Sequence, residues 1–163
     1  MFSGYYSYGD ATHGYEKSLE ALPTMSAYLN LGLTLSYVLN FRKAEDALII
    51  GLQMARNKAN QAFEAAFLTN MGLVYTNQNK LKKALEFFQE ALPLFKESGH
   101  RLGEASALNN IGAVYRHQGS LEKALEFLQE ALTLSRKGGS RLGKASPLNN
   151  IVTVYAIENI GIV

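Results

Sequence analysis

The sequence predicts an all-α fold built from repeated pairs of helices. The first observation is a period of 40 residues, which is marked by asparagine at four evenly spaced positions, Asn30, Asn70, Asn110 and Asn150. The second is internal identity, because residues 81–120 and 121–160 match at 23 of 40 positions. The third is the spacing of apolar residues, which follows the helical period, whereas strand signals are absent. A fixed period of this length is typical of a repeat architecture.

The repeat predicts three complete units and one partial unit after an N-terminal extension. The extension covers residues 1–23, in which Tyr15–Leu19 resembles the start of a second helix and Pro23 ends it early. The repeat array covers 24–163. Its units are 24–63, 64–103, 104–143 and the partial unit 144–163.

Each unit reads as two helices, and the third unit shows the pattern most clearly. Its first apolar stripe runs from Ala105 to Tyr115 at helical spacing. Gly119 then offers a residue for the left-handed conformation that ends many helices. A second stripe follows from Leu121 to Leu134, and it ends before the glycine pair at 138–139. In the partial unit, Pro147 is expected in the first turn of the last helix, where its missing N–H costs nothing.

Very small residues recur at fixed places in the units. Gly112, Ala124 and Ala131 of the third unit correspond to Gly72, Ala84 and Ala91, and to Gly32, Ala44 and Gly51. A side chain that is absent or no larger than a methyl group lets two helices pack closer than their usual 8–10 Å separation. The pattern therefore predicts closely packed helix pairs.

These small positions, together with the string from Leu108 to Tyr115, resemble the tetratricopeptide repeat over roughly residues 24–160. The 40-residue period resembles the class found in kinesin light chains, spindle-orientation adaptors and bacterial signalling proteins. The resemblance implies a right-handed α-solenoid of antiparallel helix pairs, whose first helices line a concave wall.

The resemblance also implies a function, which is to act as a scaffold that binds a peptide segment of a partner protein in the concave groove. Side-chain amides can pair with the N–H and C=O groups of an extended peptide. The expected groove residues are Asn30, Thr69, Asn70, Asn77, Asn109, Asn110, Ala113, Arg116, His117, Asn149 and Asn150. The alternative for the four asparagines of the 40-residue period is that they bond neighbouring helices and only fix the stacking.

Chaperone-adaptor relatives bind a C-terminal carboxylate with inward-facing lysine and arginine. This sequence has Ser106, Asn109 and Asn110 at those places, so acidic chaperone tails are not expected as ligands. His117 is expected to be a single surface histidine rather than a metal ligand.

The alternative function is self-assembly. Residues 148–163 supply a first helix with no second helix to cover it, and solenoids normally finish with a polar capping helix. The apolar face is expected to be covered by its own tail, by another copy of the chain, or by sequence from a larger protein of which this chain is a fragment. Homo-oligomers would then form through this C-terminal helix.

Composition excludes several function classes. The 163 residues are 47% hydrophobic and 18% charged, which is too apolar for intrinsic disorder. The net charge of +2 is too small for the usual footprint of a nucleic-acid binder. No cysteine is present, and the three histidines lack the spacing of metal ligands. No catalytic motif, cofactor motif, signal peptide or membrane-spanning run is found, so the chain is expected to be a cytoplasmic protein without enzymatic activity.

Overall fold

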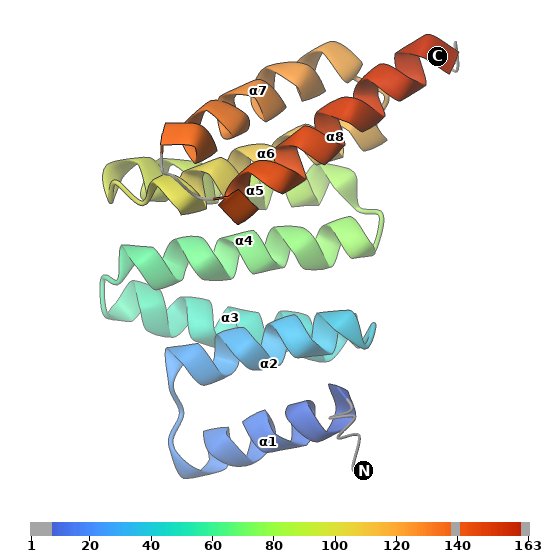
Figure 1. Ribbon diagram of the computed structural model, residues 1–163. Helices are drawn as coiled ribbons and strands as arrows, with labels where there is room; N and C mark the ends of the chain where they lie inside the picture. The colour runs from blue at the N-terminus through green and yellow to red at the C-terminus, as the bar shows by residue number, and fades with distance from the viewer. Residues whose placement is uncertain (1–7, 138–140, 161–163) are drawn as a thin grey trace, which may run out of the picture.

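The computed structural model describes residues 8–137 and 141–160, and within these ranges the chain forms eight α-helices and no strand. They follow one another as a stack that begins with α1 and ends with α7 and α8 (Figure 1). Their bounds are α1 Tyr8–Ala21, α2 Met25–Tyr37, α3 Phe41–Asn57, α4 Gln61–Asn77, α5 Leu81–Glu97, α6 Arg101–His117, α7 Leu121–Lys137 and α8 Arg141–Ile160.

The helices pair as the 40-residue period predicts. The helices α2 and α3, α4 and α5, and α6 and α7 are joined by three-residue loops, and each helix packs against the next one along the chain. Such short loops turn the chain back on itself, so neighbouring helices run antiparallel. The prediction of an all-α solenoid of antiparallel helix pairs is confirmed.

Three details differ from the sequence interpretation. The helices α4 and α6 begin at Gln61 and Arg101, three residues before the predicted units at 64 and 104. The first helix begins at Tyr8, so Tyr15 lies in its interior rather than at its start. The prediction that Pro147 lies in the first turn of the last helix is wrong, because α8 already begins at Arg141. For α6, the apolar stripe from Ala105 begins four residues after the helix does at Arg101.

The small residues occupy the tightest contacts between helices. A Cβ atom placed on Gly72 would lie 2.5 Å from the ring of Phe88, and one on Gly51 would lie 2.2 Å from the ring of Phe67. Both rings are completely buried. The same relation holds between Gly32 and Leu48, Gly103 and Phe95, and Gly112 and Leu128. The predicted close packing of helix pairs is therefore confirmed, and a large side chain fills the space that each glycine leaves.

The loops between helices depend on residues in the left-handed conformation. Gly99 and Gly119 have φ values of +67° and +75°, as predicted for Gly119. Leu39, Ala59 and Asn79 occupy equivalent places with φ values of 60°, 48° and 57°. This conformation costs an L-residue with a Cβ about 1–2 kcal/mol. The loops at Leu39 and Ala59 are therefore strained where the loops at Gly99 and Gly119 are not.

Replacing Ala59 by glycine, Ala59→Gly, is expected to raise the free energy of unfolding by up to about 1 kcal/mol, because glycine adopts the left-handed conformation without the Cβ clash. Urea denaturation followed by circular dichroism measures the change. The reciprocal variant Gly119→Ala is the control and should lower stability by a similar amount. Equal stability of Ala59→Gly and the parent would contradict the assignment of strain.

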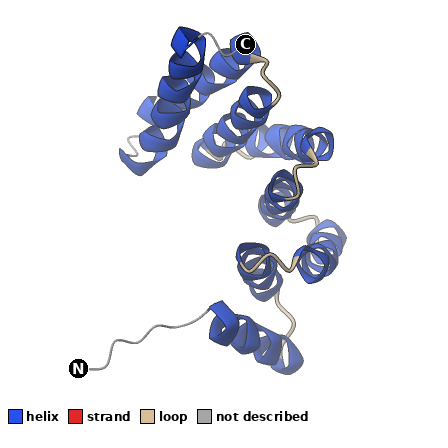
Figure 2. Ribbon diagram, turned by 90° about the vertical axis from the view of Figure 1, so that its right-hand side faces the viewer, coloured by secondary structure: helices blue, strands red, loops and turns tan. Residues whose placement is uncertain are grey.

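The backbones of the first helices of successive pairs approach one another closely, and those of the second helices do not. Cα atoms of α2 and α4, of α4 and α6, and of α6 and α8 come within 8 Å, whereas no such contact joins α3 to α5 or α5 to α7 among the described residues. Elements on the inner side of a bend lie closer together than those on the outer side. The stack therefore curves, as the turned view shows (Figure 2), with α2, α4, α6 and α8 on its concave side.

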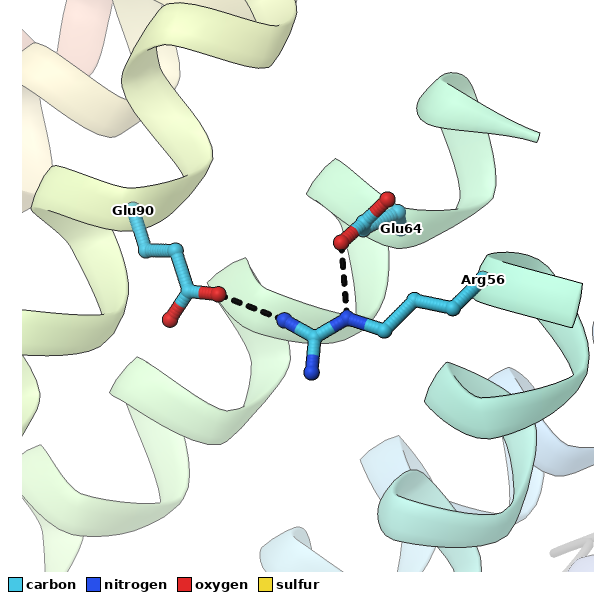
Figure 3. Close-up of polar contacts among 3 residues, drawn as sticks. All are labelled: Arg56, Glu64 and Glu90. Atoms are coloured by element: carbon cyan, nitrogen blue, oxygen red, sulfur yellow. Dashed lines mark hydrogen bonds and ion pairs between the residues drawn. The ribbon is translucent and has the colours of Figure 1, made fainter. Parts of the chain in front are cut away.

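A charged triad joins three helices at each of two successive junctions. Arg56 at the end of α3 donates to Glu64 of α4 at 2.8 Å and to Glu90 of α5 at 2.5 Å (Figure 3). Forty residues later, the ammonium group of Lys96 lies 3.9 Å from both Glu104 and Glu130. About half of the Arg56, Lys96, Glu90 and Glu130 side-chain surfaces is exposed, so solvent screens these pairs. Such pairs contribute little to stability.

Candidate functional site

Two pockets lie between the first helices of successive pairs. The first, which we call the α4 pocket, has a volume of about 320 Å³ and lies between α4 and the start of α6. Its lining residues are Ala62, Ala66, Thr69, Asn70, Phe95, His100 and Ser106. The second, which we call the α6 pocket, has a volume of about 200 Å³ and lies between α6 and the early part of α8. Its lining residues are Leu102, Ala105, Ser106, Asn109, Asn110, Ser135, Ser146 and Pro147.

The two pockets are the same site in consecutive units. Ala66, Thr69 and Asn70 of the α4 pocket correspond to Ser106, Asn109 and Asn110 of the α6 pocket, 40 residues later. Each pocket also receives one buried residue from the end of the intervening second helix, Phe95 or Ser135. Because first helices form the walls, both pockets belong to the concave side of the stack.

The structure brings four of the predicted groove residues to these pockets, Thr69 and Asn70 in one and Asn109 and Asn110 in the other. All four are half-buried. Within the part of the chain that the structure describes, the Asn110 side chain makes no hydrogen bond, so its amide is available to a ligand. The Thr69 hydroxyl donates to the Ala65 carbonyl of its own helix at 2.8 Å.

Other predicted amides bond within the solenoid. Asn150 donates from Nδ2 to Oδ1 of Asn109 at 2.9 Å, which links α8 to α6. Asn77 donates to the Ser36 hydroxyl at 3.2 Å and links α4 to α2. Asn70 donates to the Ala66 carbonyl of its own helix at 2.9 Å. The first two bonds fix the stacking of first helices, which for Asn150 is the alternative role expected of the periodic asparagines. The carbonyl groups of Asn70 and Asn150 stay available as acceptors.

The remaining predicted residues line neither of the two pockets. Asn30, Asn149 and His117 are exposed, and Ala113 is half-buried. The side chain of Arg116 is half-buried, and its Nε atom is fully enclosed without a partner among the described residues. Asn149 lies on α8, three residues after Ser146, which lines the α6 pocket.

Two residues that line the pockets, Ser135 and His100, were not predicted from the sequence. Ser135 is 1% exposed, and its hydroxyl has no hydrogen-bond partner in the described part of the chain. A signal was available, since Ser135 is a polar residue where the other units have Ala55 and Phe95 in their apolar stripes. His100 was also missed. Its Nδ1 accepts the Gly103 N–H at 3.0 Å and so caps the first turn of α6 beside the α4 pocket.

A second polar network of the described residues lies away from the pockets and ties α3 to α4. Tyr75 donates its hydroxyl to Glu45 at 3.0 Å, and Gln78 donates to the other carboxylate oxygen at 2.6 Å. Burial raises the pKa of the Tyr75 hydroxyl above its ordinary value, and the hydrogen bond to Glu45 raises this pKa further. The network holds α4 against α3, because Tyr75 of α4 is buried and its acceptor Glu45 belongs to α3.

The described residues contain no cluster of three or more histidine or acidic side chains arranged to hold a metal ion. None of the described helices combines the length and the hydrophobicity that crossing a bilayer requires.

Comparison with known proteins agrees with this architecture. A family model described as tetratricopeptide repeat matches residues 23–97, 63–137 and 103–159 of the chain. Together the three overlapping matches span residues 23–159. No curated protein matches the chain by sequence.

Solved structures with the same fold include BtubC (BKLC) from P. vanneervenii, with a TM-score of 0.75 and 20% identity over 93% of this chain. This chain covers 64% of the length of BtubC. The nearly identical TPR-like repeats of a Podosopora anserina protein described as a kinesin light chain align with a TM-score of 0.70 and 10% identity. That alignment covers 93% of this chain and 79% of the other, and a point variant of the same repeats aligns with a TM-score of 0.72. At these identities the likeness concerns the fold alone.

Proposed function

The chain belongs to the tetratricopeptide repeat family, and from that membership we propose that its concave face binds an extended segment of a partner protein. Repeats of this family generally mediate protein–protein interaction and are typically scaffolds rather than enzymes. The groove formed by α2, α4, α6 and α8 is the surface that we assign to the partner.

One observation carries the proposal, which is the position of Asn110. Its side chain lines the α6 pocket and makes no hydrogen bond with the described residues, although it lies among helices that are otherwise closely packed. An amide offers two donors and an acceptor, and these match the N–H and C=O groups of a peptide backbone. Asn149 adds an exposed amide on the neighbouring helix α8.

Replacing both residues, Asn110→Ala with Asn149→Ala, is expected to weaken partner binding by about tenfold or more, because each lost hydrogen bond contributes about 1 kcal/mol. Helix content should stay unchanged, since neither side chain supports the fold. Affinity capture from the native host supplies the partner, and isothermal titration with its isolated binding segment measures the affinity.

The matched control removes two amides from the second helix α3, Gln53→Ala with Asn57→Ala. Both positions are exposed, and this variant should bind as tightly as the parent. If the groove variant binds the segment as tightly as the parent, the concave face is not the binding surface.

A second proposal is supported by α8. Its residues Leu148, Val152 and Tyr155 are 41%, 65% and 47% exposed and fall on one face of the helix. The equivalent residues of α6, Leu108, Gly112 and Tyr115, face the second helix of their pair, since Leu128 of α7 packs over Gly112. We propose that this uncovered apolar face mediates self-association, as an alternative role for the chain.

Sedimentation velocity at several protein concentrations tests the self-association. We expect the sedimentation coefficient to rise with concentration, and Val152→Asp to abolish the rise by placing a charge on the apolar face. A single monomeric species at every concentration would reject the proposal.

The cytoplasmic location and the absence of nucleic-acid binding stay predictions from the sequence.

A further inference from the structure

We propose that the two pockets select two different side chains of the same bound segment: an apolar one in the α4 pocket and an uncharged hydrogen-bonding one in the α6 pocket. This inference rests on the peptide-binding function proposed above, and it adds the chemistry of the ligand. The two sites differ in chemistry although the 40-residue repeat would otherwise make them alike.

The α4 pocket has an apolar character. The buried Phe95 and the two alanines Ala62 and Ala66 line it. Its polar groups are largely engaged, because the Thr69 hydroxyl, the Asn70 amide nitrogen and His100 Nδ1 all bond to backbone groups of the protein. An apolar side chain of a ligand would bury its surface here against Phe95 and the two alanines, beside polar groups that mostly have partners already.

The α6 pocket is more polar than the α4 pocket, because its lining differs at three equivalent places. Ala66, Thr69 and Phe95 are replaced by Ser106, Asn109 and Ser135, whereas Ser146 contributes the same hydroxyl that Ser106 contributes to the α4 pocket. Asn110 adds an amide that is not engaged by the described residues. The pocket therefore presents both donors and acceptors to whatever enters it.

The buried hydroxyl of Ser135 indicates that the α6 pocket holds a polar group. It lies in the pocket lining at 1% exposure and has no hydrogen-bond partner among the described residues. Buried polar groups in proteins are almost always paired, so a missing partner requires an explanation. A ligand side chain that reaches the floor of the pocket would supply this partner, and a bound water molecule is the competing occupant.

The lining also limits the charge and size of the ligand group. None of the described residues that line the α6 pocket is ionisable. Among these residues, a carboxylate or ammonium group would therefore be desolvated without a counter-ion. The volume of about 200 Å³ is below the range of pockets for small-molecule ligands, but it suits a single side chain. Asparagine, glutamine, serine and threonine meet these conditions.

The pockets are close enough for two side chains of one short segment to occupy both. Ser106 lines both of them, so they are adjacent. Packed helices lie about 8–10 Å apart, and an extended chain advances about 3.3 Å per residue. The apolar and the hydrogen-bonding side chains are therefore expected two or three residues apart in the ligand.

The test uses a library of acetylated and amidated decapeptides, in which a central apolar residue is fixed and every other position is varied in turn. Binding of the full chain is measured by fluorescence anisotropy. Two or three residues to one side of the fixed apolar residue, we expect Asn, Gln, Ser or Thr to bind about tenfold more tightly than Ala, Leu, Asp or Lys.

Two variants with the same chemical change complete the design. Ser135→Ala, which installs the residue type found at Ala55, should remove the preference for a hydrogen-bonding side chain and leave the apolar preference intact. It should fold at least as stably as the parent, because it removes an unpaired buried hydroxyl. Ser18→Ala on α1, at an exposed site far along the chain from both pockets, should change neither preference.

The outcomes separate this inference from the proposed function. If peptides bind and lose affinity in the groove variant of Asn110 and Asn149, but show no polar preference or keep it in Ser135→Ala, the inference is wrong and water occupies the pocket. If no peptide binds, or if binding ignores the groove variant, the proposed function fails and the inference fails with it.

Discussion

Replacing Gly72 by alanine, Gly72→Ala, is expected to lower the free energy of unfolding by about 1–3 kcal/mol, the usual cost of overpacking a core. The direction of this change in stability is informative. Helix propensity alone would make the variant more stable, because alanine is favoured over glycine in a helix by about 1 kcal/mol. The new Cβ would lie 2.5 Å from Cε1 and 2.7 Å from Cδ1 and Cζ of Phe88. That ring is completely buried, so moving it aside would disturb the side chains packed around it.

The control for this prediction is Gly14→Ala on α1. A Cβ atom at Gly14 would meet nothing within 4 Å, so only the helix propensity should act, and stability should rise by up to about 1 kcal/mol. Urea denaturation followed by circular dichroism measures both variants. If Gly72→Ala also stabilised the chain, close contact between α4 and α5 would not be what holds the pair together.

Truncating Phe67, Phe67→Ala, is expected to lower the free energy of unfolding by about 3–5 kcal/mol. Phe67 is completely buried, and its ring fills the space over Gly51 where α3 meets α4. In a repeat protein the stability depends on contacts between neighbouring units, so a cavity at this junction weakens the coupling of the first pair to the rest.

The same denaturation experiment measures this loss, and Leu22→Ala is the control. Leu22 is 67% exposed, so its truncation should change stability by no more than about 0.5 kcal/mol. A loss below about 1 kcal/mol in Phe67→Ala would contradict the account of the core, because it would mean that the junction closes up around the missing ring.

Much of the fold could be predicted from the sequence because its determinants repeat. The glycines at 32, 72 and 112 and the apolar stripes recur every 40 residues, so each unit supports the interpretation of the next. Helix starts were less predictable, since they depend on local capping. Asn40 and Asn60 accept the N–H groups of Lys43 and Phe63 and so cap α3 and α4.

The candidate site was predictable only in part, for a physical reason. The resemblance to the tetratricopeptide repeat implied that the first helices line the concave side, and Thr69, Asn70, Asn109 and Asn110 were expected there and line the pockets. Ser135 comes from a second helix, at a position that the pattern assigns to the core. Its importance depends on a missing hydrogen-bond partner, and hydrogen bonds between helices follow from packing geometry rather than from the repeat.

The most direct measurement of the central claim is a crystal structure of the chain with a bound peptide from the library. We predict that the peptide lies along α4, α6 and α8, with its backbone within hydrogen-bonding distance of the Asn110 amide and one side chain in the α6 pocket. A peptide seated on the second helices α3, α5 and α7, with both pockets open to solvent, would contradict the claim.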